Sequence, residues 1–129
     1  MSELLPRYYF KFYNPTGFPD GGTPSISTST LIDVTSIDVI FYVTGATNGI
    51  VLDDRSPGED AITLLFDGIA AVGDLNKMRY YLQDVLENLR SQSWTNNVHE
   101  FGDSTTGEFS FRAWDDSFVT TKCVGYKMV

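Results

Sequence analysis

One stripe of apolar side chains between positions 74 and 91 constrains the fold more than any other feature of the sequence. These side chains recur at intervals of three and four residues, with one adjacent pair, as on a helix that buries a single face. Asp74 follows Gly73 as a fair N-cap, so the pattern predicts a helix over 74–91. Such a helix must cover one face of another element. The stripe consists of Leu75, Met78, Leu82, Val85, Leu86 and Leu89.

Strand patterns on both sides of the helix identify that element as a sheet. Residues 7–13 alternate between two faces, and residues 50–52 form a short return strand after an Asn-Gly turn. Residues 31–43 give the strongest strand pattern, and their apolar residues on both faces are typical of a central strand. Residues 108–129 predict a C-terminal hairpin that turns at 115–117.

These elements predict one domain of the α+β class. A chain of 129 residues is the usual length of a single domain, here 1–129. We expect an antiparallel β-sheet of about four to six strands that includes the N-terminal strand and the C-terminal hairpin. The helix at 74–91 packs on one face of this sheet. Strands bracket the helix without alternating with further helices, so a doubly wound parallel sheet is not expected.

Two segments are harder to interpret. Residues 14–30 contain three prolines, three glycines and many Ser and Thr, and a stretch of 17 residues is long for a loop in a compact domain. We predict a flexible or extended arm or loop there. Residues 56–59, Ser-Pro-Gly-Glu, match a capping box and favour a short helix through residue 66. The apolar run at 61–66 fits a buried strand equally well, and we weakly favour the helix.

Charge and composition exclude several classes of protein. With 17 acidic and 9 basic residues the net charge is −8, which repels a phosphate backbone, so no nucleic-acid partner is expected. No run of about 18 apolar residues is present, so no membrane partner is expected, and the first residues do not resemble a secretory signal. The lone Cys123 fits a reducing compartment. We expect the protein in a virion or in the cytoplasm of a host cell.

Two residues could carry acid–base or nucleophilic chemistry. A Cys123–His99–Asp103 triad would require His99 from a polar loop to meet Cys123 from a strand. A solvated loop histidine and a half-buried structural cysteine are the simpler interpretations. The sequence has no phosphate-binding glycine loop, no GxSxG motif and no zinc-ligand spacing. We therefore predict that the protein is not an enzyme and binds no cofactor.

Acidic residues flank the Ser-Pro-Gly turn at 56–58. Asp53, Asp54, Glu59 and Asp60 could supply oxygen ligands to a hard cation. The regular ligand spacing of a twelve-residue calcium loop is missing, and adjacent acidic residues commonly reflect turn chemistry and solubility. We predict no metal here, although the sequence does not settle whether this cluster binds a cation.

Aromatic residues outside the expected core indicate either an interface or a sheet whose two faces are both covered within the domain. Tyr9 and Tyr13 lie on the face of their strand opposite its phenylalanines, and Trp114 is placed in the same way in the C-terminal hairpin. One helix can scarcely cover both faces of the sheet, so these rings need a partner or a second copy of the chain. The predicted interface residues are Tyr9, Tyr13, Phe18, Ile26, Trp94 and Trp114.

Together these features favour a non-enzymatic structural or interaction protein that acts in an oligomeric assembly with protein partners. The short acidic chain with an arm at 14–30 is typical of a phage or virus particle component, such as a capsid decoration (cement) protein or a tail or connector subunit. One alternative is an acidic inhibitor or adaptor that binds a basic partner surface. A further alternative is a small-ligand-binding or enzymatic α+β domain with a pocket between helix and sheet.

Overall fold

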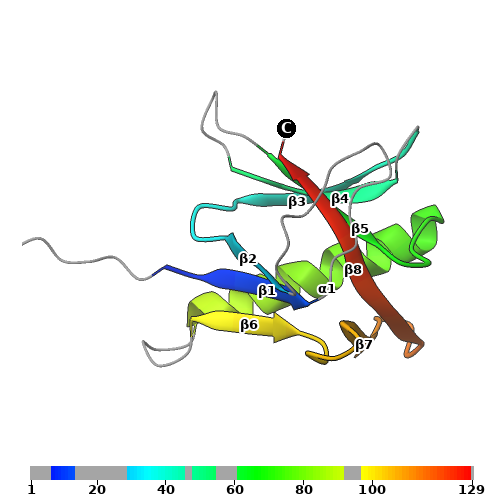
Figure 1. The fold of residues 1–129 in the computed structure, drawn as a ribbon. Helices are drawn as coiled ribbons and strands as arrows, with labels where there is room; N and C mark the ends of the chain where they lie inside the picture. The colour runs from blue at the N-terminus through cyan, green and yellow to red at the C-terminus, as the bar shows by residue number, and fades with distance from the viewer. Residues whose placement is uncertain (1–6, 14–28, 46–47, 55–60, 92–96, 129) are drawn as a thin grey trace, which may run out of the picture.

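A computed structural model describes residues 7–13, 29–45, 48–54, 61–91 and 97–128 (Figure 1). Within these residues the chain forms eight strands and one helix, so the predicted α+β class is confirmed. The elements in chain order are β1 (Tyr9–Tyr13), β2 (Ser29–Asp33), β3 (Val39–Val43), β4 (Gly49–Asp53), β5 (Ile62–Phe66), α1 (Val72–Ser91), β6 (Val98–Phe101), β7 (Glu108–Arg112) and β8 (Phe118–Met128).

The strands form two sheets, where the sequence analysis expected one. A three-stranded sheet has the order β2-β1-β6, with β1 antiparallel to β2 and parallel to β6. A five-stranded antiparallel sheet has the order β3-β4-β5-β8-β7. Its longest strand, β8, pairs with β7 through residues 118–122 and with β5 through residues 123–128. The N-terminal strand and the C-terminal hairpin therefore belong to different sheets.

The helix buries the apolar stripe that the sequence predicted. α1 begins two residues before the predicted start, and all six residues of the stripe are buried. Near its end, the Arg90 guanidinium donates hydrogen bonds to the backbone carbonyls of Val34, Thr35 and Ile37. These bonds satisfy carbonyls in the connection between β2 and β3, and they fix this connection against the helix.

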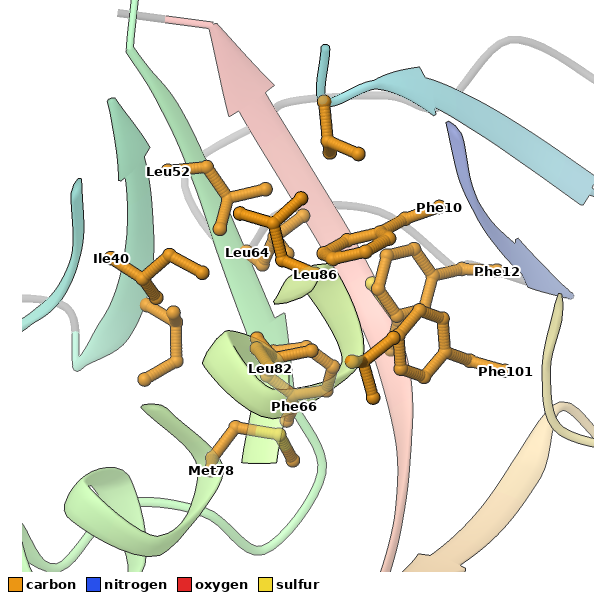
Figure 2. Close-up of a cluster of buried hydrophobic side chains, with 14 of the residues drawn as sticks. Phe10, Phe12, Ile40, Leu52, Leu64, Phe66, Met78, Leu82, Leu86 and Phe101 are labelled. Carbon is orange, nitrogen blue, oxygen red and sulfur yellow. The ribbon is translucent and has the colours of Figure 1, made fainter. Parts of the chain in front are cut away.

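One hydrophobic core lies between α1 and the inner faces of the two sheets (Figure 2). The three-stranded sheet contributes Phe10, Phe12 and Phe101, which are at most 1 % exposed. The rings of Phe12 and Phe101 stack at 4.6 Å, and Phe10 meets Phe101 edge-on at 5.1 Å. Aromatic pairs of this kind add about 0.5–1.5 kcal/mol beyond the burial of their area. Leu52 and Leu64 face these rings from the five-stranded sheet.

Three local predictions were wrong. Residues 62–66 form β5, a strand and not the end of a short helix, while 57–60 lie outside the described residues. β5 pairs with β4 on one side and β8 on the other, and a nearly continuous apolar run suits such a central strand. Residues 31–43 hold parts of two strands, because Asp33 accepts hydrogen bonds from the backbone and side chain of Thr35 and closes a turn there. The second of these strands, β3, is an edge strand instead of a central one.

The polar stretch after the helix contains a strand that the sequence analysis did not predict. Residues 98–101 form β6, in parallel register with β1, so that Phe101 pairs with Phe12. At the other edge of this sheet, β2 includes Ser29 and Thr30, the last two residues of the predicted arm. The rest of the arm, 14–28, lies outside the described residues.

Candidate functional site

A groove runs between α1 and the tip of the β7–β8 hairpin. Its volume is about 750 Å³, within the range of about 300–1,000 Å³ that is typical of small-molecule sites. On the helix, Asn76, Tyr80 and Asp84 follow one another at intervals of four residues and so lie along one side. The lining residues are Asn76, Lys77, Tyr80, Tyr81, Asp84, Arg112, Ala113, Trp114 and Asp116.

Two contacts hold the hairpin against the helix and so form the groove. The Lys77 ammonium lies 3.1 Å from the Asp115 carboxylate and donates a hydrogen bond to the Ser117 hydroxyl at 3.1 Å. The Tyr81 ring stacks on the Phe111 ring with centroids 4.2 Å apart and an interplanar angle of 2°. Hydrogen bonds from the side chain and backbone of Ser117, and then from Lys77, lower the pKa of Asp115 to about 2. Asp115 is therefore ionised at neutral pH, as this ion pair requires.

Two aromatic side chains at the groove remain largely in solvent. Trp114 is 59 % exposed and Tyr80 is 52 % exposed. Their rings meet edge to face, with centroids 5.3 Å apart. The Arg79 guanidinium lies over the Tyr80 ring at 4.6 Å, so that Trp114 is the more open of the two surfaces.

Polar groups in the groove lack partners among the described residues. The side-chain oxygen of Asn76 is buried there without a hydrogen bond. Asp84 and Asp116 form no ion pair or side-chain hydrogen bond within the described part of the chain. Arg112 has no carboxylate partner there either, and its guanidinium lies over the Phe118 ring at 5.2 Å. The site therefore combines apolar ring surface with polar groups that a ligand could satisfy.

The structure separates the predicted interface residues. Tyr9 and Tyr13 are half-buried on the outer face of the three-stranded sheet, which points away from the core. Trp114 lies at the groove, beside the helix, so the three residues do not share one face. Phe18, Ile26 and Trp94 lie outside the described residues.

The outer face of the three-stranded sheet carries paired charges between apolar side chains. Lys11 faces Leu31 on one neighbouring strand and Glu100 on the other, and its ammonium lies 3.6 Å from Glu100. Tyr13 donates a hydrogen bond from its hydroxyl to Glu100 at 2.9 Å. Leu31 is 56 % exposed, so apolar surface remains open to solvent in the middle of this face.

The three residues of the considered triad do not meet. His99 lies on β6, half-buried against the Phe101 ring, and this burial lowers its pKa. The expectation of a solvated loop histidine was therefore wrong. The Cys123 thiol is 2 % exposed and lies 3.4 Å from the Gly125 carbonyl, and burial raises its pKa to about 12. Asp103 instead accepts a hydrogen bond from the backbone of Thr105. A thiol that stays protonated is not an activated nucleophile.

The acidic cluster that flanks residues 56–58 in the sequence is only partly described. β4 ends at Asp53, and Asp54, the next residue, accepts a hydrogen bond from Ser36 at 3.5 Å. Glu59 and Asp60 lie outside the described residues. Within the residues that the structure covers, no three His, Cys, Asp or Glu side chains are placed to hold a metal ion.

The chain matches no protein-family model, no curated protein and no solved structure in the three comparisons made. No helix in the described part of the chain combines the length and the apolar content that crossing a membrane requires. What the groove could bind is therefore argued from its own geometry. The sequence indicated Trp114 but missed its partners on α1, because a helical pattern does not reveal which flank of the helix a distant hairpin will contact.

Proposed function

We propose that the protein is a non-enzymatic structural or interaction protein that assembles with further copies of itself. The observation that carries this proposal is the open outer face of the three-stranded sheet. α1 and the other sheet pack on its inner face, and no described element packs on the outer one. Leu31, Tyr9 and Tyr13 leave apolar and aromatic surface there, of the kind that forms the centre of protein interfaces.

Charge favours a second copy of the chain as the partner on this face. The whole chain has a net charge of −8, so most approaches between two copies are repulsive. On this face, however, Arg7 pairs with Asp33 at 2.9 Å and Lys11 pairs with Glu100. The face is thus locally neutral, with both signs of charge present, and two copies can meet there with the least repulsion.

A subunit of a phage or virus particle is the kind of protein that we propose works in this way. Such a subunit repeats one self-complementary contact many times, and closed symmetric assemblies are the commonest result. The alternative of an acidic inhibitor is supported by the net charge of −8, and it predicts a basic partner whose binding weakens as salt rises.

Native mass tests the self-assembly proposal. Light scattering after size exclusion, over a hundredfold range of concentration, is expected to show a dimer or larger species that dissociates on dilution. Leu31→Glu places a carboxylate opposite Lys11, which the fold accommodates, but it adds charge to the centre of the contact. We expect this variant to be monomeric while its circular dichroism is unchanged.

Val72→Glu is the matched control. Val72 is also an exposed apolar residue, at 51 %, and a carboxylate in the first turn of α1 suits the helix dipole. This variant carries the same added charge and is expected to assemble like the unmodified chain. An unmodified chain that stays monomeric at every concentration contradicts the proposal, as does a Leu31→Glu variant that assembles normally.

A further inference from the structure

The groove between α1 and the β7–β8 hairpin is a second surface, distinct from the proposed assembly face. Its walls come from residues 76–84 of the helix and 112–116 of the hairpin, whereas the assembly face lies on β1, β2 and β6. Its occupant can be inferred from three properties of the lining: the shape of its apolar surface, its balance of charge, and its balance of hydrogen-bond donors and acceptors.

The apolar surface of the groove is aromatic and local. It comes chiefly from the rings of Trp114 and Tyr80, which meet at an interplanar angle of 84°. The face of an aromatic ring is electronegative, so it attracts the weakly positive hydrogens of C–H groups. A ligand that places one C–H-bearing face on Trp114 would gain this attraction and the burial of apolar area. A long hydrophobic chain would find polar groups on the remaining walls.

The charges that line the groove favour a neutral ligand. Asp84 and Asp116 are negative, Lys77 and Arg112 are positive, and Lys77 is already paired with the adjacent Asp115. With Lys77 offset by Asp115, two carboxylates and one guanidinium remain, so an anionic ligand would be repelled on balance. A cationic ligand would be attracted to the carboxylates but would lose part of that attraction to repulsion by Arg112. A neutral polar ligand avoids both costs.

The hydrogen-bonding groups favour a ligand rich in hydroxyls. The acceptors without partners among the described residues are the carboxylates of Asp84 and Asp116. The indole N–H of Trp114 and the hydroxyl of Tyr80 are donors without a partner there. Arg112 adds a fork of N–H donors without a carboxylate partner in the described residues. A hydroxyl both donates and accepts, so it can satisfy the carboxylates as well as the guanidinium.

A proline-rich peptide, the usual occupant of aromatic grooves, fits these groups less well. Prolines present backbone carbonyls but have no N–H, so such a peptide could accept hydrogen bonds from Arg112 but would leave the carboxylates of Asp84 and Asp116 without a donor. A saccharide has the opposite character, since its ring has a C–H face and its edge carries hydroxyls.

We infer that this groove is a binding site for a neutral saccharide, which stacks on Trp114 and hydrogen-bonds through its hydroxyls to Asp84, Asp116 and Arg112. Trp114 supplies the surface on which the sugar ring rests. Asp84 on the helix and Asp116 on the hairpin lie on opposite walls, and each accepts a hydrogen bond from a sugar hydroxyl. Lys77 and Tyr81 keep those two walls together, so they position the site without touching the sugar.

The test uses the full chain and a broad array of neutral glycans, followed by nuclear magnetic resonance titration with the glycans that bind. We expect at least one neutral glycan to bind and to shift the indole N–H resonance of Trp114. Trp114→Ala and Asp84→Asn should each weaken binding by about tenfold or more, since each removes a contact to the sugar. Glu108→Gln removes one carboxylate from β7 outside the groove and should leave the affinity unchanged.

Several outcomes would overturn this inference. Retention of no neutral glycan on the array is one, and binding that survives both Trp114→Ala and Asp84→Asn is another. An octaproline peptide that binds in place of glycans, and loses affinity in Trp114→Ala, would assign the groove to peptides. Shifts of the Trp114 resonance with protein concentration alone would assign it to a second copy of the chain. Because Leu31→Glu leaves the groove intact, glycan binding by that monomeric variant would separate this inference from the assembly proposal.

Discussion

Two aromatic clusters in the described part of the chain have opposite environments. The core cluster, Phe10, Phe12 and Phe101, is at most 1 % exposed and contains no polar side-chain atoms. The groove cluster, Tyr80 and Trp114, is more than half exposed, and both rings carry a hydrogen-bonding group. Ring contacts hold both clusters together at similar distances, 4.6–6.4 Å in the first and 5.3 Å in the second. Contact geometry alone therefore does not distinguish a structural cluster from a binding surface.

What distinguishes the clusters is the area that each removes from water on folding. Hydrophobic stabilisation scales with buried apolar area, at about 25 cal/mol per Å². The core phenylalanines bury nearly their whole surface and so gain nearly all of the stabilisation that burial can provide. The fold therefore depends on them. Trp114 and Tyr80 leave more than half of their surface in water, so they gain less stability from burial and remain available for a ligand. The predictions that follow test this difference, beginning with the largest effect.

Phe101→Ala should destabilise the fold most. Among the described residues, Phe101 contacts five other aromatic rings, those of Phe10, Phe12, Tyr81, His99 and Phe109. Its truncation leaves a cavity where both sheets and the helix meet, and we expect a loss of about 3–5 kcal/mol in the free energy of unfolding. Urea unfolding followed by circular dichroism measures this loss.

Phe118→Ala is the matched control for Phe101→Ala. It removes the same side chain from a position that is 70 % exposed, where we expect a change within about 0.5 kcal/mol. Equal losses for the two variants would contradict the distinction between core and surface rings.

The core cluster was largely predictable from the sequence, and the groove was not. Alternation in residues 7–13 placed Phe10 and Phe12 on one face, and the helical period identified every buried residue of the stripe in α1. Both signals are local. Phe101 was missed because β6 has only four residues and pairs in parallel with a strand almost ninety positions earlier. No pattern among neighbouring residues predicts a pairing between two strands so far apart in the sequence.

The groove likewise depends on contacts between residues that are far apart in the sequence. Asn76, Tyr80 and Asp84 belong to the polar side of the helix in the sequence, where they are indistinguishable from a solvated face. The contacts of Lys77 with Asp115 and of Tyr81 with Phe111, each across thirty or more positions, turn that side into a wall. The sequence predicted that the Trp114 ring is exposed, but it could not predict which surface lies opposite that ring.

Lowering the pH should lower the free energy of unfolding, because His99 packs against Phe101 of the core cluster. Burial against Phe101 lowers the pKa of His99 below its ordinary 6.5, so the unfolded chain binds more protons between these two values. The free energy of unfolding should therefore be highest above about pH 7 and fall as the pH drops through 6.5. Urea unfolding at pH 7.5 and 5.5 measures the fall.

Because the chain has one histidine, His99→Asn should remove most of this pH dependence. If the free energy of unfolding is unchanged or higher at pH 5.5, then His99 binds a proton as readily in the folded chain as in the unfolded one. The pKa of His99 would then not be lowered by folding. The groove should be less affected over this interval, since its Asp115 has a pKa of about 2 and stays ionised.

Lys77→Met should loosen the groove with little effect on the core. Methionine keeps the apolar stem but removes the ammonium that joins α1 to the hairpin turn. The pKa of Asp115 should rise from about 2, yet stay below 3.8, because the hydrogen bonds from Ser117 remain. Since lowering of this pKa stabilises the fold at pH above 3.8, the variant should lose a small part of that stability at neutral pH. Carboxyl resonances in a pH titration measure the shift, and an unchanged pKa would mean that Lys77 does not pair with Asp115 in solution.

Trp114→Ala should have the smallest effect on stability and so provides the strictest test of the comparison. Its ring contacts Tyr80 in the groove but belongs to no part of the buried core, so we expect the free energy of unfolding to change by about 0.5 kcal/mol or less. Urea unfolding, run beside Phe101→Ala, measures the difference between the clusters. A loss above about 2 kcal/mol would place Trp114 with the structural rings. A negligible loss, by contrast, leaves the largest exposed ring at the groove without a role in folding, and a binding role then accounts for its position.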